Sequence, residues 1–88
     1  MATKTLRVEA YQIKGENQKG KYDFIAYRGA DERGKKCKYK FTRAVDNKPQ
    51  KIGLYHLVVD EKNMNKDNSV IFNEYWIKKI ESVELIKE

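Results

Sequence analysis

Residues 33–43, with the sequence RGKKCKYKFTR, restrict the fold of this chain more than any other segment. Six of the eleven residues are basic, and they alternate with apolar ones. The apolar set is Cys37, Tyr39 and Phe41, and the lysines of opposite parity are Lys36, Lys38 and Lys40. A β-strand places alternate side chains on opposite faces. The segment is therefore predicted to be a strand with one face in a core and a row of lysines in water. Because such a row repels itself, it favours contact with an anionic partner such as a polyphosphate backbone.

Length and composition indicate one small basic domain. With 88 residues, a single domain over residues 1–88 is expected, and it would bury about 60% of its unfolded surface. The net charge of +6 suits nucleic acid, an anionic membrane surface or an acidic protein. One cysteine, Cys37, and one histidine, His56, exclude an intrachain disulfide and a Cys/His metal cluster. Cys37 is expected to be a small core residue. No apolar run is long enough for a signal peptide or a membrane span, so no membrane partner and a cytoplasmic location are expected.

Two strands are predicted before the basic segment. Residues 5–13 alternate between apolar and polar, with a bulge or bend near Tyr11 where the parity changes. Residues 14–21 are polar, contain two glycines and are expected to form a turn. Residues 22–28 are predicted to form a second strand. Because this strand is apolar on both faces, the sequence does not decide which face is buried. The turn 29–34 joins this strand to the basic strand as a hairpin.

Two more strands are predicted after it. Residues 44–50 form a loop, and residues 52–60 form the most apolar strand of the chain. Residues 61–69 are polar and rich in asparagine, as in a loop. Residues 75–86 have many β-branched side chains, which favours a strand with an irregularity near Lys78 and Lys79, although some spacings also fit a helix. Together these elements predict an all-β fold of five strands, and closure into a small barrel would cover the sheet edges.

The order of these elements resembles a known family. A first strand and a glycine-containing turn precede the hairpin YDFIAYR–turn–GKKCKYKFTR, which is followed by the strand Gly53–Val59 and a final segment with Trp76. This order resembles the oligonucleotide-binding (OB) fold, in particular the small single-stranded-DNA-binding proteins of bacteriophages, over residues 4–86. The resemblance implies a five-stranded Greek-key barrel that binds single-stranded DNA in replication or recombination. The helix usual between the third and fourth strands of such proteins has no counterpart in residues 44–50.

Single-strand binding needs cations that follow the phosphates and aromatic faces on which bases stack. The candidate phosphate ligands are Arg28, Lys36, Lys38, Lys40 and Arg43. The candidate stacking side chains are Tyr22, Tyr27, Tyr39 and Trp76. Each aromatic residue could instead belong to the core, and the parity of Tyr39 favours the core for that residue. This chemistry predicts binding of single-stranded DNA without sequence preference, and it leaves the choice between DNA and RNA open.

Other functions were weighed against nucleic-acid binding. Asp46 with Asp60, Glu61 and Lys62 only loosely matches a metal-dependent nuclease, and the segment 60–69 departs from a calcium loop at two positions. We therefore expect no enzyme, no cofactor and no metal site. The alternatives are a protein-interaction domain that binds an acidic partner, an RNA-binding domain, or four strands plus a C-terminal helix. The last arrangement resembles dimeric transcriptional coactivators that bind melted DNA. A homodimer would suit a module this small.

Overall fold

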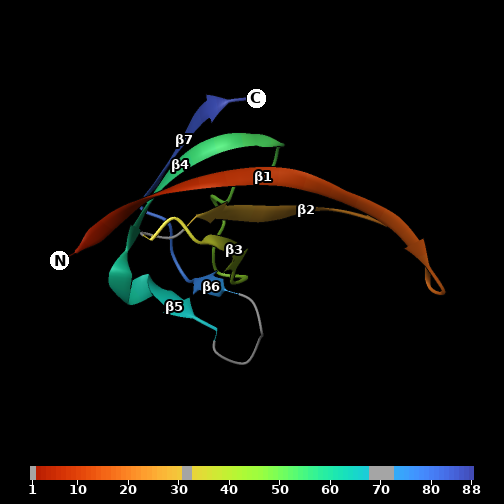
Figure 1. Ribbon diagram of the computed structural model, residues 1–88, viewed down its shortest axis with the longest axis horizontal. Helices are drawn as coiled ribbons and strands as arrows, with labels where there is room; N and C mark the ends of the chain where they lie inside the picture. Colours follow the sequence, from red (N-terminus) through yellow and green to blue (C-terminus); the bar gives the residue numbers. More distant parts are fainter. Residues whose placement is uncertain (1, 31–32, 68–72) are drawn as a thin grey trace.

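Strands dominate the computed structural model, which describes residues 2–30, 33–67 and 73–88 (Figure 1). The elements are β1 (Thr3–Asn17), β2 (Gly20–Ala30), β3 (Lys36–Phe41), β4 (Gly53–Asp60), the 3₁₀ turn η1 (Glu61–Asn63), β5 (Met64–Lys66), β6 (Glu74–Ile77) and β7 (Ser82–Lys87). The predicted all-β class is confirmed. The helical alternative for residues 75–86 is wrong, because that segment contains β6 and β7. The prediction of five strands is also wrong, since the described ranges contain seven.

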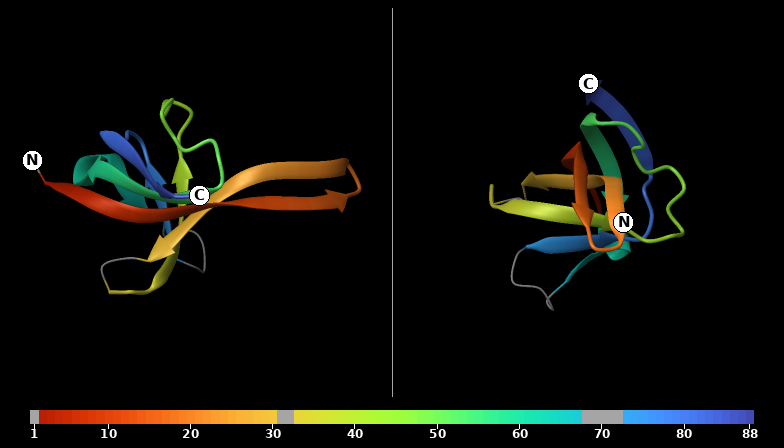
Figure 2. Two further views of the ribbon diagram at one scale, coloured as in Figure 1. Left: turned by 90° about the horizontal axis from the view of Figure 1, so that it is seen from above. Right: turned by 90° about the vertical axis from the view of Figure 1, so that its right-hand side faces the viewer.

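The seven strands form one sheet in the order β5-β6-β3-β2-β1-β4-β7. The sheet curls into a half-barrel, and the paired ends of β1 and β2 project beyond it as a long arm (Figure 2). β1 is long enough to serve both parts, because residues Thr3 to Ala10 pair with β4 and residues Val8 to Asn17 pair with β2. The arm gives the molecule a long axis of 45 Å against 31 and 27 Å in the other directions.

The arm is longer and its turn shorter than the sequence predicts. The pairing of β1 with β2 runs without a shift from Val8–Gly29 to Asn17–Gly20. The turn predicted over residues 14–21 is therefore present only at residues 18–19, and the rest of that range belongs to the two strands. Gly20 has φ of 122°, a conformation that glycine adopts readily, and Asn17 Oδ1 accepts a hydrogen bond from the Lys19 amide. The bulge predicted near Tyr11 is wrong. The apolar parity changes there because β1 leaves the half-barrel, not because the register slips.

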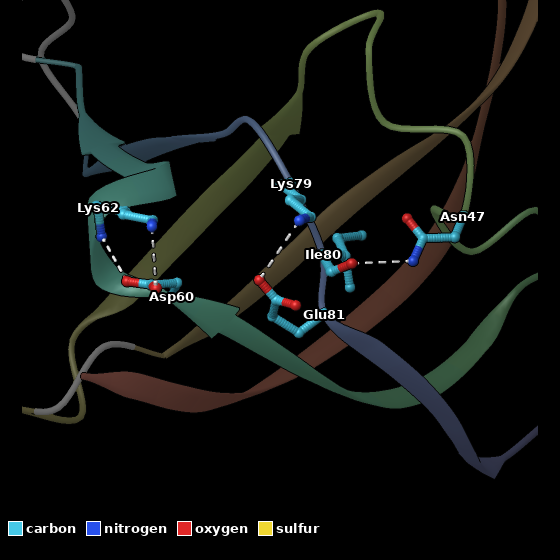
Figure 3. Close-up of polar contacts among 6 residues, drawn as sticks. All are labelled: Asn47, Asp60, Lys62, Lys79, Ile80 and Glu81. Carbon is cyan, nitrogen blue, oxygen red and sulfur yellow. Dashed lines mark hydrogen bonds and ion pairs between the residues drawn. The ribbon is translucent and has the colours of Figure 1, made fainter. Parts of the chain in front are cut away.

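Residues 75–86 do not form one continuous strand. β6 pairs in parallel with β3, and β7 pairs antiparallel with β4 across the sheet, so residues 78–81 cross from one side to the other. The Asn47 side chain, from the loop before β4, donates a hydrogen bond to the Ile80 carbonyl at 3.1 Å (Figure 3). The Glu81 amide donates to the Val58 carbonyl at 2.7 Å. The irregularity predicted near Lys78 and Lys79 is thus present, as an interruption of the strand between β6 and β7.

The core occupies the concave side of the sheet. Its fully buried side chains include Val8, Leu57, Val59 and Ile77. β3 follows the predicted alternation: Cys37 and Tyr39 are buried, whereas the three lysines are exposed. Gly29 of β2 leaves room for the Arg7 carbonyl oxygen of β1 and for the Tyr39 ring of β3, because a Cβ at Gly29 would meet both. The tip of the hairpin turn 29–34, residues 31–32, and the end of the predicted loop 61–69, residues 68–69, lie outside the described residues.

Candidate nucleic-acid interface

Side chains of the arm and the β3 lysines lie on the same, convex side of the sheet. Arg28 lies directly opposite Lys38 in the β2–β3 pairing, and residues two positions apart in a strand share a face. The same rule extends this face along the arm and across to β6, where Lys40 lies opposite Trp76. We call this the outer face, and besides the acidic Glu9 and Glu74 it includes Tyr11, Ile13, Tyr22, Phe24, Arg28, Lys36, Lys38, Lys40 and Trp76. It contains six of the nine residues predicted to bind nucleic acid.

The arm carries two exposed aromatic rings. Phe24 is 52% exposed and Tyr22 is 39% exposed. Their ring centroids lie 6.1 Å apart with the planes tilted by 36°. Gly15 makes room for this arrangement, because a Cβ at Gly15 would overlap the Tyr22 ring. Phe24 was not among the predicted site residues, although its parity with Tyr22 could have identified it.

Arg28 is held in place between the arm and the lysine row. Its Nε donates a hydrogen bond to Glu9 Oε1 at 2.6 Å, and its guanidinium lies 4.3 Å from the centroid of the Tyr11 ring. The hydrogen bond to Glu9 raises the pKa of Arg28 above its ordinary value. The Arg28 side chain is still 55% exposed, so it can also meet a phosphate. Glu9 offsets part of its charge.

Lys40 is positioned by a buried carboxylate. Its Nζ lies 3.1 Å from Glu74 Oε1 and 5.4 Å from the centroid of the Trp76 ring. Glu74 is only 1% exposed, and among the described residues its Oε2 atom has no hydrogen-bond partner. The Trp76 indole donates to Asp67 Oδ2 at 3.2 Å and is half-buried. Lys40 therefore has a structural role as well as an exposed charge.

Tyr27 and Tyr39 lie on the core side of the sheet. They face each other across β2 and β3, and Tyr39 is 3% exposed and stacked on Tyr75 at 6.1 Å. Tyr27 donates its hydroxyl to the Pro49 carbonyl at 2.6 Å, and its ring meets Phe41 edge-on at 4.7 Å. Burial raises the pKa of Tyr27. Neither residue belongs to the outer face, although both line the groove that opens beside it.

The outer face is hollowed where the arm meets β3 and β6. A groove of about 420 Å³ there is lined by aromatic, aliphatic and charged side chains, among them Tyr11, Phe24, Lys38, Lys40 and Trp76. Tyr27 and Tyr39, two of the predicted site residues, also line this groove, from the core side of the sheet. Arg43 lies outside this groove, exposed in the turn that follows β3. The arrangement places ring faces and cations along one continuous surface.

Other kinds of site have less support. Across residues 2–30, 33–67 and 73–88, no three His, Cys, Asp or Glu side chains are grouped so that they could hold a metal ion. In the part of the chain that the structure describes, no helix has the length and apolar character needed to cross a membrane. Comparison with known protein families, with curated proteins and with solved structures gives no match to this chain.

Proposed function

We propose that this protein binds single-stranded DNA without sequence preference, along the outer face, in replication or recombination. The observation that carries the proposal is the exposed ring pair Tyr22 and Phe24 on the same face as the β3 lysines. Every base has a π-face, so stacking on such rings tolerates any sequence, while lysines and arginines follow the phosphates. A basic face without rings would favour single strands and duplexes alike.

The strand connectivity supports an OB-type Greek-key barrel as the underlying fold. In this proposal β6 and β7 are the two halves of a fifth strand, which pairs with β3 at one end and with β4 at the other. β5 is then a short addition beside β6. OB folds bind oligonucleotides on the face formed by their second and third strands, which corresponds to the outer face here. The element order also resembles that of the small single-stranded-DNA-binding proteins of bacteriophages.

The residues divide into two roles within this proposal. Lys36 and Lys38 contact the phosphates directly, and Arg28 adds a fixed donor beside them. Tyr22 and Phe24 stack on bases near the tip of the arm, where both rings are exposed. Trp76 lines the groove and reports on binding, because it is the single tryptophan of the chain.

The test compares three nucleic acids of equal phosphate number: an oligothymidine, the corresponding single-stranded RNA and a DNA duplex. Each is labelled and titrated with the protein at two salt concentrations, and Trp76 emission is recorded alongside. We expect tight binding of the oligothymidine, with quenching of Trp76, and much weaker binding of the duplex. Log K should fall by about 0.7 per neutralised phosphate for each unit of log salt. Equal affinity for single strands and duplex would refute the stacking role, and no binding at low salt would refute the function.

A further inference from the structure

Glu74 of β6 is a buried carboxylate on the outer side of the sheet. It lies opposite Lys38 in the pairing of β6 with β3, so its side chain is on the same side as the β3 lysines. It is 1% exposed, and the four other largest fully buried side chains of the described residues are aliphatic. The proposed function gives this carboxylate no role beyond its ion pair with Lys40.

One oxygen of the Glu74 carboxylate has no partner. Oε1 lies 3.1 Å from Lys40 Nζ, whereas Oε2 accepts no hydrogen bond from the described residues. An ionised carboxylate accepts hydrogen bonds at both oxygens and donates none. A buried acceptor without a donor lowers stability, and a hydrogen bond formed there is stronger than one in water. A ligand that brings a donor to Oε2 therefore gains more affinity than it would at an exposed carboxylate.

Glu74 lines the groove of the outer face together with aromatic side chains. Tyr11, Phe24 and Trp76 also line this groove, and its volume of about 420 Å³ is in the range of small-molecule sites. The Trp76 ring is fixed in place, because its Nε1 donates to Asp67 Oδ2 at 3.2 Å. Unpaired bases stack on rings of this kind. The groove thus offers a single base both aromatic surface and a carboxylate.

The hydrogen-bonding pattern of a carboxylate discriminates among the bases. Bases of an unpaired strand can be read on their Watson–Crick edges, and a group that only accepts needs donors there. Guanine has two adjacent donors, N1–H and the N2 amino group. Adenine and cytosine have a ring nitrogen acceptor next to their amino group, and thymine has a carbonyl oxygen on each side of its N3–H. Because a carboxylate oxygen repels such acceptors, guanine is the base that fits both oxygens.

We propose that the groove binds one unstacked guanine of the single strand, which donates N1–H and N2–H to the two carboxylate oxygens of Glu74. Lys40, whose side chain is 54% exposed, turns outward from Oε1 and contacts a phosphate as the base enters. This guanine site rests on the proposed function and adds to it a preference at one position. Stacking on Tyr22 and Phe24 remains indifferent to sequence.

The test uses labelled oligothymidines of about eight nucleotides, within the usual site size of an OB fold, with one central base replaced. The replacements are guanine, 7-deazaguanine, hypoxanthine, adenine and cytosine. Guanine and 7-deazaguanine share one Watson–Crick edge, and both should lower Kd about fivefold or more relative to thymine. Hypoxanthine lacks the N2 amino group and should lose much of this gain, while adenine and cytosine should gain little.

Equal Kd for all of these bases, or a larger gain with adenine or cytosine, would overturn the guanine site. Binding of the plain oligothymidine would still support the proposed function in that case. Absence of binding to every oligonucleotide at low salt would refute the proposed function and the guanine site together.

Glu74→Gln tests where guanine is read. The variant keeps the shape of the side chain but replaces one acceptor by a donor, so the ratio of Kd for thymine to Kd for guanine should fall to near one. The ratio is the readout because loss of a negative charge can change the affinity for every strand alike. Glu9→Gln is the matched control, since Glu9 is the acid that pairs with Arg28 and does not line the groove, and it should keep the ratio.

Urea unfolding checks that both variants are folded, and the base series on the unaltered protein decides the matter if Glu74→Gln is not. A guanine preference that survives in folded Glu74→Gln, or that Glu9→Gln loses equally, would overturn the proposal.

Discussion

Replacement of Phe24 by alanine separates binding from stability most sharply. Phe24 is 52% exposed, so about half of its surface is buried and its removal should lower the free energy of unfolding by about 1 kcal/mol. If bases stack on its ring, the same change removes about 1–3 kcal/mol of binding free energy, which is about 5- to 150-fold in Kd. The loss of affinity should therefore exceed what the small loss of stability explains.

The assay is fluorescence anisotropy of a labelled oligothymidine at one low salt concentration, with urea unfolding of the same preparations. Ile52→Ala is the matched control, because Ile52 is 54% exposed and precedes β4, outside the outer face. It should change stability by a similar small amount and leave the affinity unchanged. Tyr22→Phe should also bind normally, since it keeps the ring. Unchanged affinity of Phe24→Ala, or an equal loss in Ile52→Ala, would refute stacking on the arm.

Three further changes test the charges and the support beneath them. Lys36→Ala with Lys38→Ala should reduce the slope of log K against log salt by about 1.4, measured by the same titration, and an unchanged slope would contradict their contact with phosphates. Lys40→Ala should lower the free energy of unfolding, measured in urea, by about 1–3 kcal/mol, because it leaves the buried Glu74 carboxylate without its cation. The double variant Lys40→Ala with Glu74→Gln should recover much of this loss. No recovery would argue against a stabilising ion pair between Lys40 and Glu74. Tyr27→Phe removes one hydrogen bond and should cost about 0.5–1.5 kcal/mol. Because the pKa of Tyr27 is raised, its contribution is complete below pH 10 and declines as the pH rises through the folded pKa, so the variant should lose less stability there.

Local alternation predicted β3 well because a strand with one wet face shows its pattern within a few residues. In residues 36–41 the alternation correctly predicted both the core side chains and the exposed lysines. β2 was ambiguous because its first half belongs to the arm, where Phe24 is exposed, and its second half belongs to the barrel, where Tyr27 is half-buried. Nothing in the residues themselves marks the point at which the arm leaves the core.

The misjudged elements depend on pairing partners that the residue pattern does not reveal. Residues 14–21 are polar because the arm is solvated, and a polar strand looks like a turn when its partner is unknown. The break at residues 78–81 follows from pairing with two strands on opposite sides of the sheet, which β-branched composition cannot express. Phe24 was missed as a site residue because its place on the exposed arm, outside the core, is not visible in the residue pattern.

The pairing of β6 with β3 and of β7 with β4 also has a consequence for how the chain folds. Both contacts join residues 74–87 to strands made much earlier, so the sheet cannot close until that segment has been synthesised. Contacts between residues so distant in sequence slow folding and prolong the life of partly folded chains. During that interval β3 is an open edge that a second nascent chain could pair with, and lysines on an edge discourage such pairing. Lys36, Lys38 and Lys40 would then protect the newly made chain from aggregation before they meet any ligand.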